Sequence, residues 1–303
     1  MTIGPTDADV AFLAERPRLE GLAYRLLGSR TDAEDTVSDA YLRWRGGDRA
    51  AIGNPAAFLT TVTTRLALDR LRRAARERQR YVGPWLPEPL PTDPAELPTP
   101  GSPDDAVLLA ESLTYGFLAV LERLDPDERA AYLLREVYAE PYAVIADAIG
   151  RSPAACRQVV HRARERVHGA PRFSLDRTRA EALAERLTAA LLADDVDALG
   201  ELLHEDVVLV SDGGAERRAA RRPVVGRDRV GRLLASLARQ VFTPGVDART
   251  QVRWVNNQLA YAVWIDGELD SVMTIAVDGA TETARAVHVI RNPDKLRSVE
   301  GTS

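Results

Sequence analysis

Long polar side chains recur at helical spacing in residues 150–167, GRSPAACRQVVHRARERV. A helix there would place its apolar side chains on one side and its polar side chains on the other. Guanidinium, amide and imidazole groups on an exposed helix face can bond phosphates and base edges in the major groove of DNA. The side chains in position to do so are Arg157, Gln158, His161 and Arg162.

The segment before this helix completes a helix-turn-helix pattern. Residues 143–149 form a short amphipathic helix, Gly150 permits the turn, and Ser152 with Pro153 begins the second helix. A recognition helix needs one apolar face for docking and one polar face for DNA. Cys156 lies on the apolar face and is expected to be buried. A helical hairpin with a merely solvated basic face is the alternative.

A second group of cations follows Asn54-Pro55, where another helix is expected to begin. Residues 65–80 contain seven arginines. An aspartate within such a basic face favours base reading and orientation of neighbouring arginines over a plain phosphate clamp. The exposed side is expected to carry Arg65, Asp69, Arg72 and Arg73, with Arg70 beside them.

The last third of the chain offers Asp212 and His288 as an acid–base pair. Asp212 precedes two glycines and is explained as a turn former, while His288 is expected to fill a pocket wall. We therefore expect no catalytic residue and no enzyme. Cys156 is the only cysteine, which excludes an internal disulfide, and neither a metal nor a cofactor is expected.

Charge is distributed unevenly along the 303 residues, although the net charge is only −5. Arginine-rich stretches at 65–80 and 151–172 flank residues 83–112, which contain six acids and no base. This pattern suggests two contacts with a polyanion. No stretch approaches the length of a membrane span and no signal peptide is evident, so the expected location is the cytoplasm.

The expected architecture is multidomain. Two all-α modules are expected at 1–80 and 105–170, joined by a Pro-rich acidic linker at 81–104. An α+β domain at 176–291 and a tail at 292–303 follow. Within the α+β domain, the periodicity predicts helices at 177–193, 196–203 and 226–240, and strands at 207–210, 250–255, 259–265, 271–277 and 284–291.

Together these motifs resemble the extracytoplasmic-function (ECF) sigma factors of bacterial RNA polymerase. DAEDTVSDAYLRW (32–44) is similar to region 2.2, and NPAAFLTTVTTRLALDRLRR (54–73) to regions 2.3 and 2.4. Residues 121–167 resemble region 4, which contains the helix-turn-helix. The resemblance covers roughly the first 170 residues in the right order.

This resemblance implies transcription initiation with core RNA polymerase, through its β′ clamp and β flap, at promoter DNA. The residues that would dock on the β′ clamp are Asp32, Glu34, Asp35, Asp39, Tyr41 and Leu42. Those at the −10 element, where bases are flipped out, would be Asn54, Arg65, Asp69, Arg70, Arg72 and Arg73. Those at the −35 element would be Arg157, Gln158, His161 and Arg162.

The linker begins with YVGPWLPEP (81–89), which matches a motif of the SigJ-like subgroup, sigma factors with a fused SnoaL-like domain. In sigma factors this segment threads into the polymerase. Tyr81, Trp85 and Pro87 would form a rigid apolar strip. The sequence leaves open whether the strip docks on a partner or packs against the first domain.

The C-terminal domain resembles the SnoaL-like, NTF2-like cone, a fold that encloses a pocket. The sequence leaves open whether a small-molecule ligand binds in this pocket. Asp212, Gly213 and Gly214 match a DGGG-type loop in which Ala215 replaces the last glycine. The tail matches a C-terminal motif of the subgroup with Asn292, Pro293, Asp294, Lys295 and Leu296. The implied role is regulatory, with the tail meeting the linker motif or region 2.

Two other functions remain as alternatives. One is a ligand-sensing helix-turn-helix regulator, and the other is a SnoaL-type enzyme with a DNA-binding appendage. The acidic helix at 32–44 and the separate −10-type helix disfavour a repressor, which needs neither.

Overall fold

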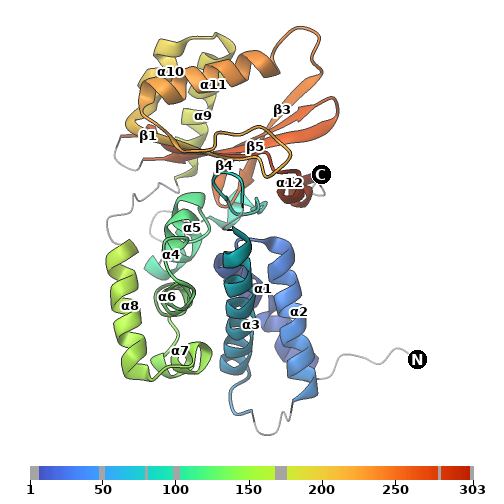
Figure 1. Cartoon of the computed structure of the whole chain (residues 1–303), viewed down its shortest axis with the longest axis vertical. Helices are drawn as coiled ribbons and strands as arrows, with labels where there is room; N and C mark the ends of the chain where they lie inside the picture. Colours follow the sequence, from blue (N-terminus) through green and yellow to red (C-terminus); the bar gives the residue numbers. More distant parts are fainter. Residues whose placement is uncertain are drawn as a thin grey trace, which may run out of the picture. The chain divides into compact units, whose positions relative to one another are not determined.

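The computed structural model describes residues 7–47, 52–78, 81–97, 103–167, 176–278 and 281–300 (Figure 1). The predicted limits at 1, 80 and 170, and parts of the predicted linker (98–102) and tail (301–303), lie outside these residues. Contacts divide the chain into a helical unit, residues 1–79 with 120–169, and a sheet unit, residues 80–119 with 170–303. The first predicted helical module and residues 120–169 of the second thus share one unit. The linker and residues 105–119, which were predicted to belong to the second helical module, lie with the C-terminal domain.

The first three helices of the helical unit pack around a leucine core. They are α1 (Asp7–Leu27), α2 (Arg30–Gly46) and α3 (Pro55–Arg78). Leu19, Leu22 and Leu59 are completely buried in the helical unit. Truncating one of them to alanine would cost about 2–5 kcal/mol. Ser29 caps α2, with its hydroxyl accepting from the Asp32 amide at 3.2 Å.

The rest of this unit contains the predicted helix-turn-helix. It comprises α6 (Pro126–Tyr132), a π-helical turn (Leu133–Val137), α7 (Tyr142–Ile149) and α8 (Pro153–Val167). A capping box of Asp125 and Glu128 begins α6. Gly150 ends α7 with φ 71°, a left-handed conformation that glycine adopts without steric cost. Helix α5 (Tyr115–Leu121) spans the boundary of the two units in sequence.

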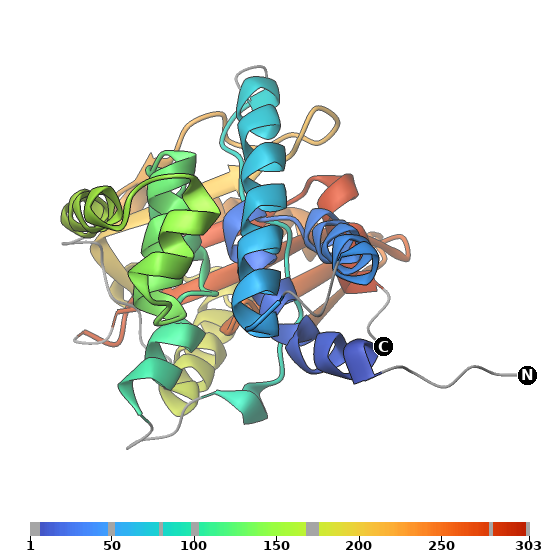
Figure 2. The same ribbon diagram turned by 90° about the horizontal axis from the view of Figure 1, so that it is seen from below.

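Helix α3 packs against α6 and α7 (Figures 1 and 2). Glu122 accepts from Arg78 at 2.6 Å and from Arg129 at 2.8 Å. Burial alone would raise the pKa of Glu122, but Arg129 and Arg78 outweigh it and lower the pKa. This carboxylate therefore remains ionised at neutral pH and joins the two helical modules.

The sheet unit contains one six-stranded sheet among its described residues, in the order β2-β1-β6-β5-β4-β3. Strands β1 and β6 are parallel, and the other neighbours are antiparallel. The strands are β1 (Leu203–Asp212), β2 (Val224–Val225), β3 (Ala248–Val255), β4 (Gln258–Ile265), β5 (Glu268–Val277) and β6 (Ala284–Ile290).

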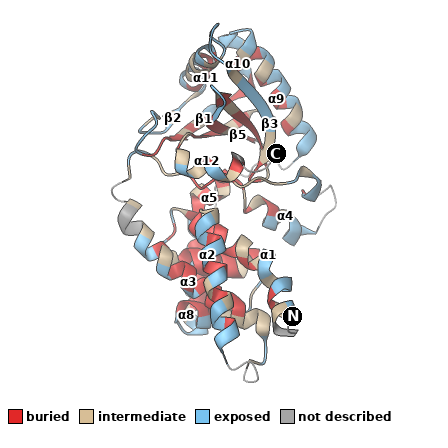
Figure 3. Cartoon of the chain, turned by 90° about the vertical axis from the view of Figure 1, so that its right-hand side faces the viewer, coloured by how far each residue is buried: buried red, intermediate tan, exposed pale blue. Residues whose placement is uncertain are grey.

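The two faces of this sheet are buried by different parts of the chain (Figures 1 and 3). The helix-covered face packs on α9 (Arg177–Leu192), α10 (Val196–Leu202) and α11 (Arg227–Val241). The opposite face, called the linker face here, buries Leu86 of the linker, Tyr115 of α5, and Leu296 with Val299 near the C-terminus. Alternating side chains of each strand serve the two faces.

The predicted tail forms helix α12 (Pro293–Glu300). Asn292 begins it, because the Asn292 side chain accepts from the Asp294 amide at 3.1 Å. Proline at the first helical position fits this start. The predicted linker contains a 3-10 turn (Pro94–Glu96) and the first residue of α4 (Asp104–Glu111).

The five predicted strands agree with β1 and β3–β6 to within a few residues. Strand β2 has only two residues and gave no periodic signal. No described helix has both the length and the apolar character needed to cross a membrane.

Candidate nucleic-acid interface and linker clasp

Helix α8 presents the four predicted −35 residues on one exposed face. Arg157, Gln158, His161 and Arg162 are all exposed, while Cys156 is fully buried. Ser152 begins the helix, with its hydroxyl accepting from the Ala155 amide at 3.2 Å. The division of faces expected of a recognition helix is therefore present.

Three of these side chains already have partners. The Arg157 guanidinium lies 5.4 Å from the centre of the Tyr142 ring. His161 lies 3.6 Å from Glu165, and Arg162 lies 3.7 Å from Glu128. The Arg157 and His161 side chains are exposed, and such contacts of exposed side chains are worth about 1 kcal/mol or less, so DNA phosphates can replace them.

The predicted −10 residues lie on α3 but do not form one free surface. Asn54 caps this helix by accepting from the Ala57 amide at 3.1 Å. Asp69 and Arg73 are exposed. Arg70 instead turns to α2 and donates to Asp39 at 2.7 Å. Arg70, which was predicted to contact DNA, is thus bonded to Asp39, which was predicted to contact the polymerase.

Arg65 and Arg72 are engaged by the helix-turn-helix module. Arg65 donates from Nε at 3.0 Å and from Nη2 at 2.6 Å to the Asp147 carbonyl, in the last turn of α7. Arg72 donates to Asp127 at 2.8 Å, and Arg151 donates to the same carboxylate at 2.7 Å. Burial alone would raise the pKa of Asp127, but the two arginines outweigh it and lower the pKa.

Helix α2 presents the predicted acidic docking face. Asp32, Glu34 and Asp35 are exposed, and Asp39 is half-buried. Leu42 exposes 63% of its surface, although it is a large apolar residue.

Tyr41 borders a hollow of about 310 Å³ between α1 and α2. Its hydroxyl donates to Asp9 at 2.9 Å, and its ring lies 4.7 Å from Phe12. The combination of acidic rim and exposed leucine suits a basic partner with an apolar anchor.

The sheet unit contains a cluster that we call the linker clasp, formed by Tyr81, Leu86, Asp212, Asn292 and Lys295. Asp212 is completely buried at the end of β1. One carboxylate oxygen accepts from the Tyr81 hydroxyl at 2.6 Å, and the other from the Leu86 amide at 2.9 Å and the Lys295 ammonium at 2.6 Å. Linker, DGG loop and C-terminal helix therefore meet at one carboxylate.

Lys295 makes further contacts with the linker. It donates to the Leu86 carbonyl, and its Nζ lies 4.0 Å from the centre of the Trp85 ring and 5.2 Å from that of Tyr81. Burial, together with the bond to Asp212, raises the pKa of the Tyr81 hydroxyl, which stays protonated as a donor. The Lys295 side chain is only 12% exposed, and a largely desolvated ammonium beside aromatic rings makes a stronger cation–π contact than an exposed one.

The two glycines of the loop allow this approach. At Gly214, φ is 61°, and an added Cβ would lie 2.8 Å from the Asn292 side chain. At Gly213 an added Cβ would lie 2.2 Å from the Arg217 carbonyl oxygen. The loop thus needs glycine for close packing against the NPDKL motif, in addition to the predicted turn at Asp212, whose carboxylate accepts from the Gly214 amide at 3.0 Å.

A second anchor of the linker was not foreseen from the sequence. Asn256, completely buried in the turn between β3 and β4, accepts from the Leu90 amide at 2.8 Å and donates to the Leu113 carbonyl at 3.0 Å. In the sequence, Asn256-Asn257 indicated only a turn between two strands. Gln258 likewise accepts from the Tyr115 amide at 2.9 Å.

The candidate pair of Asp212 and His288 does not assemble into an acid–base site. His288 lies on the linker face, where its ring stacks on Tyr115 with 5.4 Å between ring centres. It was expected to fill a pocket wall, but it does not line the cavity on the helix-covered face. Burial lowers the pKa of His288 to about 4, so it is neutral at pH 7. Asp212 already accepts four hydrogen bonds. Within the described ranges no cluster of His, Cys, Asp and Glu could hold a metal ion.

A helix-turn-helix, a separate arginine-rich helix beside an acidic one, and a fused α+β domain define a sigma-type transcription factor with an additional domain. Family models agree with this order. Sigma-70 region 2 matches residues 11–77, Sigma-70, region 4 matches residues 116–167, and the SnoaL-like domain matches residues 184–296.

Relatives extend the similarity over nearly the whole chain. It is 40% identical over 296 residues to the ECF RNA polymerase sigma factor SigJ of Mycobacterium tuberculosis (strain ATCC 25618 / H37Rv), covering 94% of this chain and 92% of SigJ. It is 29% identical over 289 residues to the probable ECF RNA polymerase sigma factor SigI of the same strain, covering 94% and 93%. The crystal structure of M. tuberculosis SigJ superposes with a TM-score of 0.74 at 35% identity, covering 95% of this chain and 98% of that one.

The chain therefore belongs to the family of ECF RNA polymerase sigma factors, in the form that has a fused SnoaL-like domain. The predicted family, fold class and sigma-factor function are confirmed. Such membership makes the chain a regulator of transcription. The roles of individual residues stay predictions.

Proposed function

We propose that this sigma factor binds core RNA polymerase through α2 and promoter DNA through α3 and α8, and that the SnoaL-like domain controls it by holding the linker. Its place of action would be that of the polymerase, the cytoplasm. The exposed acids and Leu42 on α2, and the exposed polar face of α8, support the assignment of these surfaces.

The contacts inside the helical unit imply that its two modules separate before both promoter elements are engaged. Elements centred about 25 base pairs apart are separated by roughly 85 Å at 3.4 Å per base pair. Arg65, however, lies within hydrogen-bonding distance of α7. Opening would release Arg65 and Arg72 for DNA.

The linker clasp is the observation that carries the regulatory part of the proposal. A sigma-factor linker that threads into the polymerase must be free to leave other surfaces. In this chain Tyr81 and Leu86 are held by the buried Asp212, and Leu90 by Asn256. The linker must therefore be released from the sheet unit before the polymerase can bind it. The free-energy cost of this release opposes polymerase binding and gives the fused domain a means of control.

We regard the SnoaL-like domain as regulatory and not catalytic. The carboxylate of Asp212 is occupied by structural donors, and His288 is buried beneath Tyr115. Neither residue lines the cavity on the helix-covered face.

The experiment is in vitro transcription with purified core polymerase, comparing the wild type with Lys295→Met. The variant keeps an unbranched apolar stem of similar length but removes the ammonium from the clasp. We expect transcript yield at limiting sigma factor to rise at least about threefold, which corresponds to about 0.65 kcal/mol. Arg297→Met on the same helix is the control, because its ion pair with Asp294 is exposed.

An unchanged or lower yield for Lys295→Met would contradict the proposed control by the clasp. Transcription by both proteins that is no greater than that of core polymerase alone would contradict the sigma-factor assignment itself.

A further inference from the structure

Strand β3 forms one edge of the six-stranded sheet, and the linker pairs with one end of it (Figure 1). The Thr92 amide donates to the Trp254 carbonyl at 3.1 Å, and the Asn256 amide donates to the Leu90 carbonyl at 2.8 Å. The linker then turns away from the strand in the 3-10 turn Pro94–Glu96. This edge of the sheet therefore accepts an added antiparallel strand, and the linker uses only the end of it.

The middle of the β3 edge has free backbone groups. The backbone groups of an antiparallel strand point alternately to its two sides. Because those of Trp254 and Asn256 point to the linker, those of Thr250 and Val252 point to the same, open side. Among the described residues these groups have no hydrogen-bond partner there. A hollow of about 530 Å³, lined by β3 and by the linker at Pro94, leaves room for further chain.

The linker face of β3 presents cations beside this free edge. Arg249 pairs in register with Trp264 of β4, which is buried on the linker face, and Arg253 lies on the same face. Their guanidinium groups lie 4.3 Å and 5.3 Å from the centre of the Trp264 ring. Arg249 is exposed and forms no ion pair among the described residues. The acids of the nearby linker turn, Asp93 and Glu96, are exposed and pair with neither arginine.

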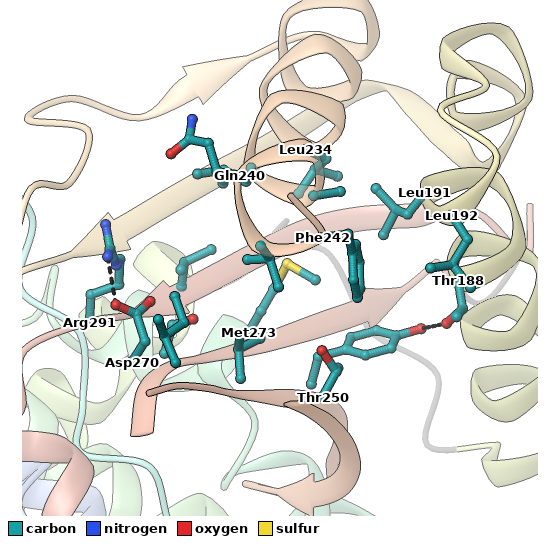
Figure 4. A pocket seen from close by; sticks show the side chains of 18 of the residues that line it. Thr188, Leu191, Leu192, Leu234, Gln240, Phe242, Thr250, Asp270, Met273 and Arg291 are labelled. Atoms are coloured by element: carbon teal, nitrogen blue, oxygen red, sulfur yellow. Dashed lines mark hydrogen bonds and ion pairs between the residues drawn. The ribbon is translucent and has the colours of Figure 1, made fainter. Parts of the chain in front are cut away.

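The opposite face of β3 is apolar at the edge. Val252 exposes 51% of its surface, and Phe242, which follows α11, exposes 49%. Thr250 and Phe242 border the cavity on the helix-covered face of the sheet (Figure 4). A strand that paired with this edge would therefore meet the arginines with one set of alternate side chains and the exposed valine with the other set.

Like charges disfavour a second copy of the chain as that strand. The register that uses both free residues would set Thr250 of one copy opposite Val252 of the other. In that register Arg249 of each copy would lie opposite Arg253 of its partner, and like charges directly opposite each other are destabilising. Charge on an edge strand is a common protection against such self-pairing, and it favours an acidic strand instead.

We propose that the β3 edge binds an extended segment of a partner protein in which acidic and apolar residues alternate. The backbone of this segment pairs with Thr250 and Val252 and extends the sheet by one strand. Its carboxylates lie beside Arg249 and Arg253, and its apolar side chains cover Val252 and Phe242. Alternation is essential, because only an alternating strand meets both faces of the edge.

Fluorescence anisotropy with the full chain tests the site. The probe is a fluorescein-labelled peptide of alternating glutamate and valine, eight residues long to match β3. A peptide of the same composition, with all glutamates before all valines, is the matched comparison. We expect the alternating peptide to bind at least about tenfold more tightly, which corresponds to about 1.4 kcal/mol.

Two variants separate strand pairing from charge. Val252→Pro removes an outward amide that an added strand needs, at an edge position where proline is tolerated, and should weaken binding at least about tenfold. Arg249→Glu should weaken binding of the glutamate peptide and create binding of an alternating lysine–valine peptide. Misfolding cannot produce this gain, so the test stays valid if Val252→Pro does not fold. Arg232→Glu, exposed on α11, is the control and should change neither affinity.

The proposed site would be overturned by equal affinity for the alternating and block peptides, or by no binding of the wild type up to the solubility limit. Unchanged affinity of Val252→Pro, or no binding of the lysine peptide by Arg249→Glu, would overturn it equally. A dimer in sedimentation equilibrium that Val252→Pro converts to a monomer would assign the edge to a second copy of the chain instead. The measurements need neither polymerase nor DNA, so their outcome is independent of the proposed function.

Discussion

Removal of the Lys295 ammonium probes the clasp most directly, because it leaves the Asp212 carboxylate buried without a cation. Asp212 is 0% exposed, and the Lys295 side chain is 12% exposed. Breaking a buried ion pair by removing one partner costs about 3–5 kcal/mol. In a unit of roughly 150–250 residues, this loss lowers the melting temperature by about 6–20 °C.

The assay is urea unfolding followed by tryptophan fluorescence. Trp85, Trp254 and Trp264 belong to the sheet unit and only Trp44 to the helical unit, so the signal reports mainly on the sheet unit. Lys295→Met alone should lower the free energy of unfolding by about 3–5 kcal/mol. Adding Asp212→Asn should restore part of this free energy, because the double variant buries no unpaired charge. The coupling energy from the cycle should lie at about 1–3 kcal/mol.

Arg297→Met measures the effect of removing an exposed ion pair on the same helix, and it should lower the free energy of unfolding by less than about 1 kcal/mol. If Lys295→Met cost no more than Arg297→Met, and the cycle showed no coupling, then the clasp would be a weak surface contact. The reasoning from burial would be refuted.

Three further predictions concern the helical unit and the loop. Asp127→Asn should loosen the packing of α3 on the helix-turn-helix and increase the radius of gyration in small-angle scattering. Because the pKa of Asp127 is lowered, its ion pairs stabilise the packing above about pH 4 and are lost as the pH falls below that value. Gly214→Ala should destabilise the sheet unit by about 1–3 kcal/mol in urea, since alanine is strained at φ 61° and its Cβ would meet Asn292. Arg157→Ala should weaken promoter binding of the polymerase holoenzyme by about 1–3 kcal/mol in a footprinting titration, if Arg157 reads a base.

Local patterns predicted the helix-turn-helix because its determinants are close together in sequence. Gly150, Ser152 and Pro153 specify the turn and the helix start, and apolar spacing specifies the buried side of α8. The strands were predictable for the same reason, since alternation and turn signals act within about ten residues.

The clasp partners depend on tertiary structure and could not be assigned from local patterns. Tyr81 and Asp212 are separated by 131 residues, and Lys295 and Leu86 by 209. The sequence suggested that the tail meets the linker or region 2, and left open whether the linker strip packs on a partner or on the first domain. In the structure the strip packs on the C-terminal domain, and the buried carboxylate of Asp212 has a role beyond its turn.

The engagement of Arg65 and Arg72 illustrates a different limit. Their exposed side on α3 was predicted from helical spacing, and spacing contains no information about a second module that covers it. Asp127 has the sequence signal of a helix start, within LDPDERA, and nothing there indicates that it pairs with Arg72. A single sequence thus identifies candidate DNA contacts more readily than the conformations in which they are free.

The same tertiary contacts make regulation energetically plausible. If release of the linker costs about 3 kcal/mol, the free-linker form is populated at roughly one part in 150, and the apparent affinity for a polymerase that selects this form falls by the same factor. A ligand or a polymerase surface then needs only a comparable difference in affinity between the held and released states to change output by two orders of magnitude. Under the proposed function, a fused domain that holds the linker through one buried carboxylate would thereby be sufficient to set the activity of the DNA-binding modules, without touching DNA itself.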